Sequence, residues 1–140
     1  MLAECVTDLF NKVNAIPSLA ATVGLTIGGK APDPGMTKVP LPAAWVISKA
    51  AASTLDKGAP VVSRNLPCLL NFAVLLYIPY TSQADLVTNQ LPLLESVIKS
   101  VHGTDSPAYE RWAFNGYQLE ALNSDRLIYR IEFFVDVGTF

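Results

Sequence analysis

The sequence has little of what most enzyme sites are built from. It contains one histidine and two cysteines among 140 residues, and charged side chains make up only 16% of it. Histidine and cysteine are the usual nitrogen and sulfur ligands of protein-bound transition metals, so no metal centre is predicted. Because an ordinary soluble domain is about 25% charged, we expect surplus apolar surface that copies of the chain or other partners cover.

Long apolar runs are absent as well. No stretch of 18 consecutive apolar residues occurs, so no transmembrane helix is predicted. Residues 1–5 contain no basic region ahead of an apolar core, and a signal peptide is therefore not predicted. The length fits a single domain, and we expect residues 1–140 to form it.

Charge gives no reason to expect a nucleic-acid or membrane surface, because the net charge is only −2. It is unevenly distributed along the chain. Residues 1–70 carry six basic and four acidic side chains, whereas residues 71–140 carry four basic and eight acidic ones. This polarity suits head-to-tail packing of subunits.

The clearest pattern that is present covers residues 125–137. Two sets of side chains alternate in it: one parity holds Leu127, Tyr129, Ile131, Phe133, Val135 and Val137, and the other holds Arg126, Arg130, Glu132 and Asp136. Such alternation is typical of a strand with one buried and one wet face. Because the pattern runs almost to the end of the sequence, we expect a compact structural module without a catalytic tail.

The other elements follow from periodicity and turn residues. The pattern predicts helices over 2–15 and 83–101, strands over 43–47, 68–78 and 112–122, and connections at 28–42, 49–65 and 104–110. Residues 18–27 fit either a helical turn or a strand. The strand over 68–78 is apolar on nearly both faces, which is typical of a central strand or of one covered at an interface.

Local signals refine these elements. Ser82 and Asp85 resemble a capping box at the start of the second helix. Pro92 should kink that helix or split it near Gln90, and Gly116 is a candidate β-bulge. The order of main elements is α-β-β-α-β-β, which predicts an α+β fold: a mainly antiparallel sheet of about four strands with two helices packed on one face.

The residue types that catalysis usually requires have simpler, structural explanations in this sequence. His102 directly precedes Gly103 at the end of the second helix, where a cation favours the helix dipole, and we expect this role instead of a general base. No Gly-x-Ser-x-Gly elbow supports a serine triad. Cys5 and Cys68 fall on apolar faces of an expected helix and strand, so buried free thiols are expected, although a disulfide between them stays open.

Two further patterns are excluded as sites. Residues 24–30 resemble a phosphate-binding loop, but Lys30 is followed by Ala31 instead of Ser or Thr. Glu120 and Glu132 could face one another across the last hairpin, yet arginines share that face, which is typical of a solvated mixed-charge surface. We therefore predict no catalytic, cofactor-binding or metal-binding residue, no cofactor, and no enzyme activity.

Basic side chains offer a candidate interface. Four of them lie in or beside the two long connections, where they suit contact with an acidic partner, and two more lie on the polar parity of the last strand. The candidate interface residues are Lys38, Lys49, Lys57, Arg64, Arg126 and Arg130.

Several segments, in their order along the chain, match a known pattern. They are Leu41-Pro42-Ala43-Ala44-Trp45-Val46-Ile47, a loop carrying Lys57-Gly58, Phe72-Ala73-Val74-Leu75-Leu76, the helix at 83–101, and Gly116-Tyr117-Gln118-Leu119 ahead of the strand that begins at Asp125. This order resembles the tail terminator (tail completion) proteins of long-tailed bacteriophages, the group that includes minor tail protein U. The resemblance covers most of the chain and is one of order and pattern.

The resemblance implies a structural role in a virion. Proteins of this group form a ring, a hexamer, that caps the tail tube, ends tail polymerisation and presents a surface to the head connector. The implied partners are further copies of the chain, the tail tube protein and the head-completion or connector protein, with genome DNA only passing through the lumen and no membrane. The implied location is the tail or neck of the virion, and the host cytoplasm during assembly.

Two alternatives stay open. A head-completion or connector protein of the neck would share the composition and would differ in the virion neighbour that it binds. A small-molecule-binding α+β module, or an enzyme built on one, would require a concave pocket with convergent polar groups.

Overall fold

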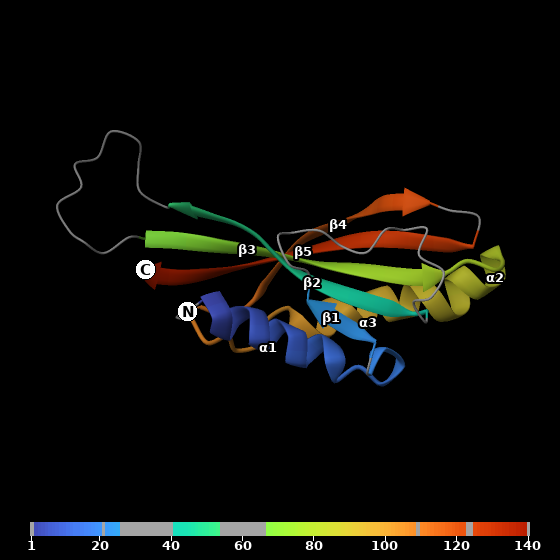
Figure 1. Cartoon of the computed structure of the whole chain (residues 1–140), viewed down its shortest axis with the longest axis horizontal. Helices are drawn as coiled ribbons and strands as arrows, with labels where there is room; N and C mark the ends of the chain where they lie inside the picture. The colour runs from blue at the N-terminus through green and yellow to red at the C-terminus, as the bar shows by residue number, and fades with distance from the viewer. Residues whose placement is uncertain are drawn as a thin grey trace.

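The computed structural model describes residues 2–20, 22–25, 41–53, 67–108, 110–122 and 125–139. Its elements are α1 (Leu2–Asn14), a 3₁₀ turn (Pro17–Leu19), β1 (Val23–Leu25), β2 (Ala43–Ser53), β3 (Pro67–Pro79), α2 (Gln83–Asp85), a π-helical turn (Leu86–Gln90), α3 (Leu91–Val101), β4 (Ala113–Leu122) and β5 (Arg126–Thr139). The strands form one sheet in the order β1-β2-β3-β5-β4 (Figure 1). No helix among these residues is long and apolar enough to cross a membrane.

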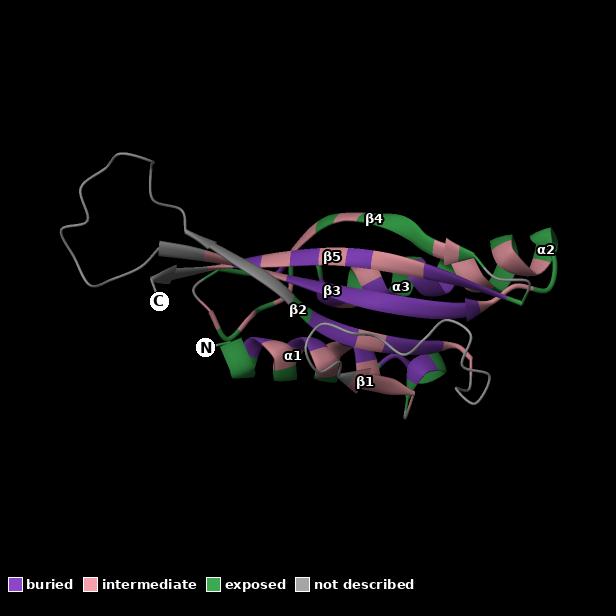
Figure 2. Cartoon of the chain, turned by 45° about the horizontal axis from the view of Figure 1, so that its top comes forward, coloured by how far each residue is buried: buried purple, intermediate pink, exposed green. Residues whose placement is uncertain are grey.

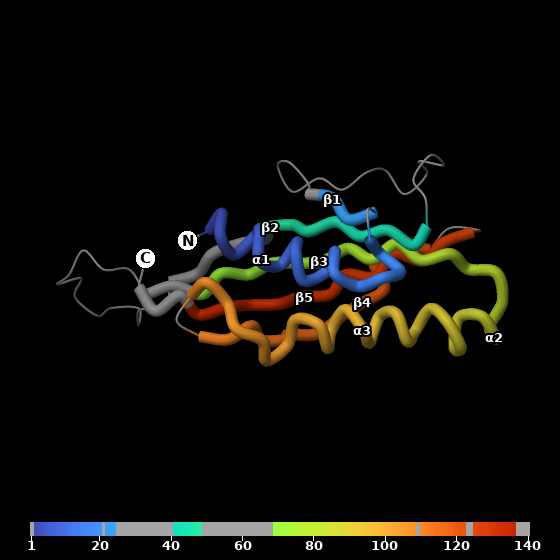
Figure 3. The backbone as a smooth tube through the Cα atoms, turned by 90° about the horizontal axis from the view of Figure 1, so that it is seen from below, coloured from blue at the N-terminus to red at the C-terminus, as the bar shows by residue number. Residues whose placement is uncertain are grey.

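The predicted α+β fold is confirmed. Helix α1 and the continuous α2–α3 helix lie side by side on one face of the sheet and run in opposite directions (Figure 3). The sheet has five strands instead of about four, because the ambiguous segment 18–27 contains both a 3₁₀ turn and the short strand β1. β1 pairs with β2 in parallel, whereas all other strand pairs are antiparallel.

Helix α1 follows the predicted range almost to the residue. Cys5, Leu9 and Val13 recur at helical spacing and are fully buried against the sheet. Lys12 in the last turn complements the negative end of the helix dipole. The helix ends at Asn14, three residues before Pro17, which begins the 3₁₀ turn.

The second helix is split as Pro92 predicts. Pro92 has no N–H to donate, so an uninterrupted α-helix would lose a hydrogen bond there. The chain instead widens into a π-helical turn that ends at Gln90, in which the N–H of Leu91 donates to the carbonyl of Leu86. The capping prediction is half correct. The hydroxyl of Ser82 accepts from the N–H of Asp85, but the carboxylate of Asp85 accepts from Asn89 and Gln90 instead of closing a reciprocal box.

Strand β3 is central, as its two-sided apolar pattern predicts. It pairs with β2 along one edge and with β5 along the other. One face of it joins the main core beneath the helices, through Leu70, Phe72, Val74, Leu76 and Ile78. The other face joins a smaller cluster that consists of Ala43, Ile47, Ala73, Leu75, Tyr77 and Ile128. Figure 2 shows how burial concentrates on β3 and β5 and diminishes on β4.

The sequence predicts that alternate residues of β5, starting from Arg126, form a solvent-exposed face. The structure shows that this face is largely buried. Arg126 is only 5% exposed and Ile128 only 2%. Arg130, Glu132, Phe134 and Asp136, on the same parity, are half-buried. The prediction is wrong because the sheet carries an apolar cluster on this face too, next to β2 and β3.

Strand β2 is longer than its apolar signal. The pattern predicts a strand over 43–47, followed by a connection from residue 49, yet pairing with β3 continues to Ser53 opposite Cys68. A bulge between Ser48 and Ala50 resets the register midway. The alanines that follow have little propensity of their own for a strand, so the extension depends on the cross-strand partner. The connections predicted at 28–42 and 49–65 otherwise lie mostly outside the described residues.

Two glycines carry local consequences. Gly116 has a φ of +127°, which L side chains rarely adopt, and the β4–β5 register shifts between Phe114 and Gly116. The predicted bulge is therefore confirmed. Gly24 lies opposite Trp45, and a Cβ atom there would stand 3.0 Å from the indole Nε1, so a larger residue would push the ring away.

Phe133 should be among the most costly core positions of β5. It is fully buried in the main core and its ring centroid lies 6.1 Å from that of Phe114. Phe133→Ala should lower the free energy of unfolding by about 3–5 kcal/mol, measured by urea denaturation. The adjacent, half-buried Phe134 lies on the opposite face, and Phe134→Ala should cost clearly less. Equal losses for the two variants would contradict the assignment of faces.

Acid should loosen the π-helical turn. Hydrogen bonds from Asn89 and Gln90 hold the pKa of Asp85 below its usual range. The stabilisation by the charged form is complete above the unfolded pKa, near 3.9, and is lost as pH falls through the lower folded value. NMR shifts of the Asn89 and Gln90 side-chain amides should therefore titrate below about pH 4. In Asp85→Asn this transition should vanish, and a midpoint above the usual range would refute the account.

Candidate interaction surfaces

The structure describes only part of the predicted interface. Lys38, Lys57 and Arg64 lie outside the described residues, and Lys49 is placed in β2 by its backbone alone. The remaining two candidates, Arg126 and Arg130, lie on the same parity of β5, on the face opposite the helices. Their roles in an interface stay a prediction.

Arg130 is held by the edge strand. Its Nη2 donates to Oε1 of Glu120 at 2.6 Å, and Gln118 Nε2 donates to the other carboxylate oxygen at 3.3 Å. Both charged side chains are about one third exposed or less. The Nε of Arg130 is buried and has no hydrogen-bond partner within the described residues. Arg130 therefore serves first to tie β5 to β4, and Glu132 is not paired with Glu120.

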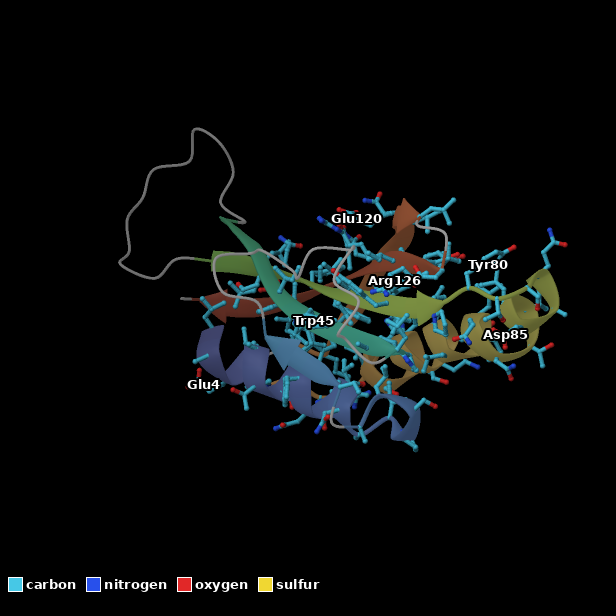
Figure 4. All side chains as sticks on the ribbon, turned by 45° about the vertical axis from the view of Figure 1, so that its right-hand side comes forward. Glu4, Trp45, Tyr80, Asp85, Glu120 and Arg126 are labelled. Carbon is cyan, nitrogen blue, oxygen red and sulfur yellow. The ribbon has the colours of Figure 1, made fainter. Side chains whose placement is uncertain are left out.

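Arg126 is buried where β5 begins. Its Nε and Nη2 lie 3.3 Å from the two carboxylate oxygens of Asp125, which is itself exposed (Figure 4). The guanidinium lowers the pKa of Asp125 by hydrogen bonding to its carboxylate. At this end of the sheet, the solvent-exposed member of the pair is thus the negatively charged carboxylate of Asp125.

An exposed apolar row lies on β4, the edge strand. Tyr117, Leu119 and Leu122 are 55%, 49% and 64% exposed. They pair across the sheet with Ile131, Tyr129 and Leu127 of β5, so they lie on the face that carries the helices. We call these three residues the β4 row. The sequence does not reveal this row, because the alternation at Tyr117 and Leu119 looks like that of a strand with a buried face.

A second bulge completes the row. The β4–β5 register shifts between Leu119 and Ala121, which leaves Glu120 as the extra residue. Without the bulge, Leu122 would fall on the opposite parity from Leu119. Only the three-dimensional register therefore shows that Leu122 belongs to the row.

Open grooves flank helix α1. One, of about 560 Å³, lies between the helix and Pro107, and its lining includes Glu4, Thr7 and Asp8. The other, of about 460 Å³, lies between α1 and α3 and is lined by Lys12, Ala15, Ile16, Pro17, Ser96 and Ser100. Their volumes are large enough for a small ligand, but Asp8 of the first groove and Lys12 of the second are hydrogen-bonded to each other.

Asp8 joins α1 to the segment before β4. Its Oδ2 accepts from Lys12 Nζ at 2.6 Å and from Trp112 Nε1 at 2.8 Å, and Lys12 also donates to the carbonyl of Asp105. Trp112 is almost fully buried and its ring meets Phe72 edge to face in the main core. Two structural donors thus share one oxygen of this carboxylate, and the bonds tie α1 to the segment before β4.

The reactive residue types also have structural roles. Nδ1 of His102 accepts a hydrogen bond from the N–H of Phe114 at 3.0 Å. His102 thus joins the end of α3 to β4, and its expected interaction with the helix dipole stays a prediction. Cys5 is a free, buried thiol whose pKa is raised by burial. No group of metal-binding side chains occurs within the described ranges.

Comparison with solved structures gives a likeness of fold. The sequence matches no protein-family model and no curated protein. The structure matches a chain in the solved virion of a native gene transfer agent (GTA) particle, with a TM-score of 0.62 and 14% sequence identity. The match covers 93% of this chain and 91% of that chain. At this identity, the likeness shows that the two chains share a fold.

The Asp8 contacts should contribute more to the free energy of unfolding than a surface ion pair of similar composition does. Asp8→Asn removes the charge that Lys12 and Trp112 share and should lower the free energy of unfolding by about 1–3 kcal/mol. Asp105, whose side chain is 91% exposed, lies 3.3 Å from Arg111, and Asp105→Asn should cost under about 1 kcal/mol. Urea denaturation compares the two, and a smaller loss for Asp8→Asn would contradict its structural role.

Proposed function

We propose that this chain is a structural subunit of a phage-like virion. The observation that carries the proposal is the likeness of fold to a chain of the GTA virion, which extends over more than nine tenths of both chains. A likeness over both full lengths means that the whole architecture is shared, not a common α+β fragment. Fold alone does not determine function, so the proposal also draws on the surfaces of this chain.

Within the virion, we assign the chain to the tail terminator position. It forms a ring, a hexamer, that caps the tail tube, ends polymerisation and offers a joining surface to the head connector. The order of segments that resembles tail terminators supports this assignment. Apart from the loop carrying Lys57-Gly58, which lies outside the described residues, these segments form β2, β3, the split helix and the β4–β5 hairpin. Such a subunit acts in the tail or neck of the virion and assembles in the host cytoplasm.

A structural role also fits the chemistry of the described residues. Asp8, Cys5 and His102 are the residues with the most obvious catalytic potential, and each has a structural role in the core or at a helix end. A catalytic site would instead require polar groups that converge on a place for substrate. The proposal therefore includes no cofactor and no enzyme activity.

Deleting the gene from the phage or particle that encodes it tests the proposal. Tail tubes should then lack a uniform length and fail to join heads, because nothing ends polymerisation or covers the tube. Electron microscopy of lysates measures both properties. Tails of normal length that are not joined to heads would assign the chain to head completion instead, and normal joined tails would refute both roles.

Charge reversals test the predicted interface without disturbing the core. Lys57→Glu and Arg64→Glu should weaken docking to the neighbouring virion proteins by about tenfold and leave the melting temperature unchanged. Lys99→Glu is the matched control, because Lys99 is 80% exposed on α3 and lies only 3.9 Å from Glu95 in a surface pair. Binding to purified tail tubes, measured by co-sedimentation, should fall for the first two variants only. An equal fall for Lys99→Glu would speak against the assigned residues.

A further inference from the structure

The segment that follows α3 lies along the outer edge of β4, where that strand begins. β5 pairs with one edge of β4, and no strand pairs with the other edge in the described part of the sheet. The N–H of Gly103 donates to the carbonyl of Trp112 at 2.8 Å, and the N–H of Trp112 donates to the carbonyl of Thr104 at 3.0 Å. Gly103 has a φ of +76°, which lets the chain turn back directly after the helix. The two bonds resemble those of a short antiparallel strand pair.

His102 supplies the next acceptor along this edge. Phe114 lies two residues after Trp112, so its N–H points to the same side, away from β5. Its acceptor is Nδ1 of His102, at 3.0 Å, instead of a main-chain carbonyl. The imidazole thus takes the place that a carbonyl of a further strand would occupy, and it covers the sheet edge at Phe114. Because His102 is exposed, a proton can reach the ring without unfolding of the chain.

We propose that His102 is a pH-sensitive cap on the outer edge of β4. A neutral imidazole can accept at Nδ1, whereas the charged ring donates from both nitrogens and accepts at neither. Histidine is the side-chain type that changes charge between about pH 5 and 8, and the chain contains one histidine. Protonation therefore leaves the N–H of Phe114 unpaired at the sheet edge, where water or another strand can reach it. This inference does not depend on the proposed role in a virion.

The end of α3 offers the charged ring an interaction of its own. The N–H of His102 donates to the carbonyl of Ile98, which places this residue at the last turn of the helix. The negative end of the helix dipole favours a cation there. The hydrogen bond to Phe114 thus belongs to the neutral ring, and the dipole interaction belongs to the charged ring. Acid exchanges one interaction for the other, and this exchange makes the contact a switch.

The charged groups on the elements packed around His102 do not oppose this change. Three opposite pairs are already joined within their own elements: Glu95 with Lys99 on α3, Asp105 with Arg111 ahead of β4, and Asp8 with Lys12 on α1. The other carboxylates on these elements and on β5 are Glu110, Glu132 and Asp136. Negative charges favour a charged imidazole, so these groups act in the same direction as the helix end.

Asparagine provides a matched variant that keeps an acceptor and removes the titration. Its Oδ1 is attached to Cγ, as Nδ1 of histidine is, and it does not change charge. Hydrogen exchange of the full chain, followed by NMR at about pH 8 and about pH 5, gives the protection of each amide relative to an unstructured chain at the same pH. In wild type, protection of the Phe114 amide should be at least about threefold lower at the acidic pH, as expected for one hydrogen bond. His102→Asn should show no such difference, and His102→Ala should show the low protection at both pH values.

The amide of Trp112 is the internal reference, because its acceptor is a carbonyl that does not titrate. Its protection should stay the same at both pH values. An equal loss at Trp112 would overturn the proposal, since the whole segment after α3 would then be opening. Constant protection of Phe114 in wild type, or the wild-type pH dependence in His102→Asn, would overturn it as well.

A second measurement needs no variant and decides the matter if a substitution at His102 unfolds the chain. Nuclear spins on the two nitrogens of an N–H···N hydrogen bond are coupled through that bond. The coupling between the amide nitrogen of Phe114 and Nδ1 of His102 should be present in wild type at about pH 8 and lost at about pH 5. Its absence at the higher pH would refute the contact, and its persistence at the lower pH would refute the switch.

Discussion

The fold depends on β3, whose two faces both enter apolar clusters and whose two edges are both paired. One of its faces contributes to the main core, the other to the smaller cluster with Tyr77 and Ile128, and both of its edges are paired. A strand of this kind has no polar side on which to meet water, so it is stable only when β2, β5 and the helix layer are all in place. The arrangement makes the sheet a single cooperative unit instead of two hairpins that could form separately.

The helices take their positions from that requirement. Cys5, Leu9 and Val13 of α1 enter the same core as Leu94 and Val97 of α3, so the two helices cover one face of the sheet together. Two polar attachments join this layer to the strands. Asp8 connects α1 to Trp112, and His102 connects the end of α3 to Phe114 in β4. The two attachment points lie on either side of Ala113, the first residue of β4, so they hold the start of this strand against the helix layer.

Much of the fold could be predicted because its longest elements have strong periodicity. Helix α1, the split at Pro92, the central position of β3 and the bulge at Gly116 all follow from local patterns of apolar, proline and glycine residues. β1 could be predicted only as one of two alternatives for residues 18–27, because three residues cannot show a period. The burial of Arg126 could not be predicted either. The alternation along β5 predicts a solvent-exposed face there, and only the neighbouring strands of the folded sheet bury it.

The candidate surface was harder to predict for a related reason. Tyr117 and Leu119 show the same alternation as buried residues of β5, and sequence does not reveal which strand ends the sheet. Strand order places β4 at the edge, and the bulge at Glu120 brings Leu122 into the row. Basic residues were the natural candidates from composition. Of the two whose side chains the structure describes, one ties two strands together and the other is buried beside Asp125.

The position of β5 also constrains how the chain reaches its native state. β5 is synthesised after every other described strand, yet it lies between β3 and β4 and is the sheet partner of β4. Until it emerges from the ribosome, β3 has one open edge and an incompletely covered core, and β4 has no ladder to join. Most sheet contacts thus link distant parts of the sequence, a topology associated with slow folding. Until then the nascent chain carries its most apolar strand only half covered, a state in which exposed apolar surface favours aggregation.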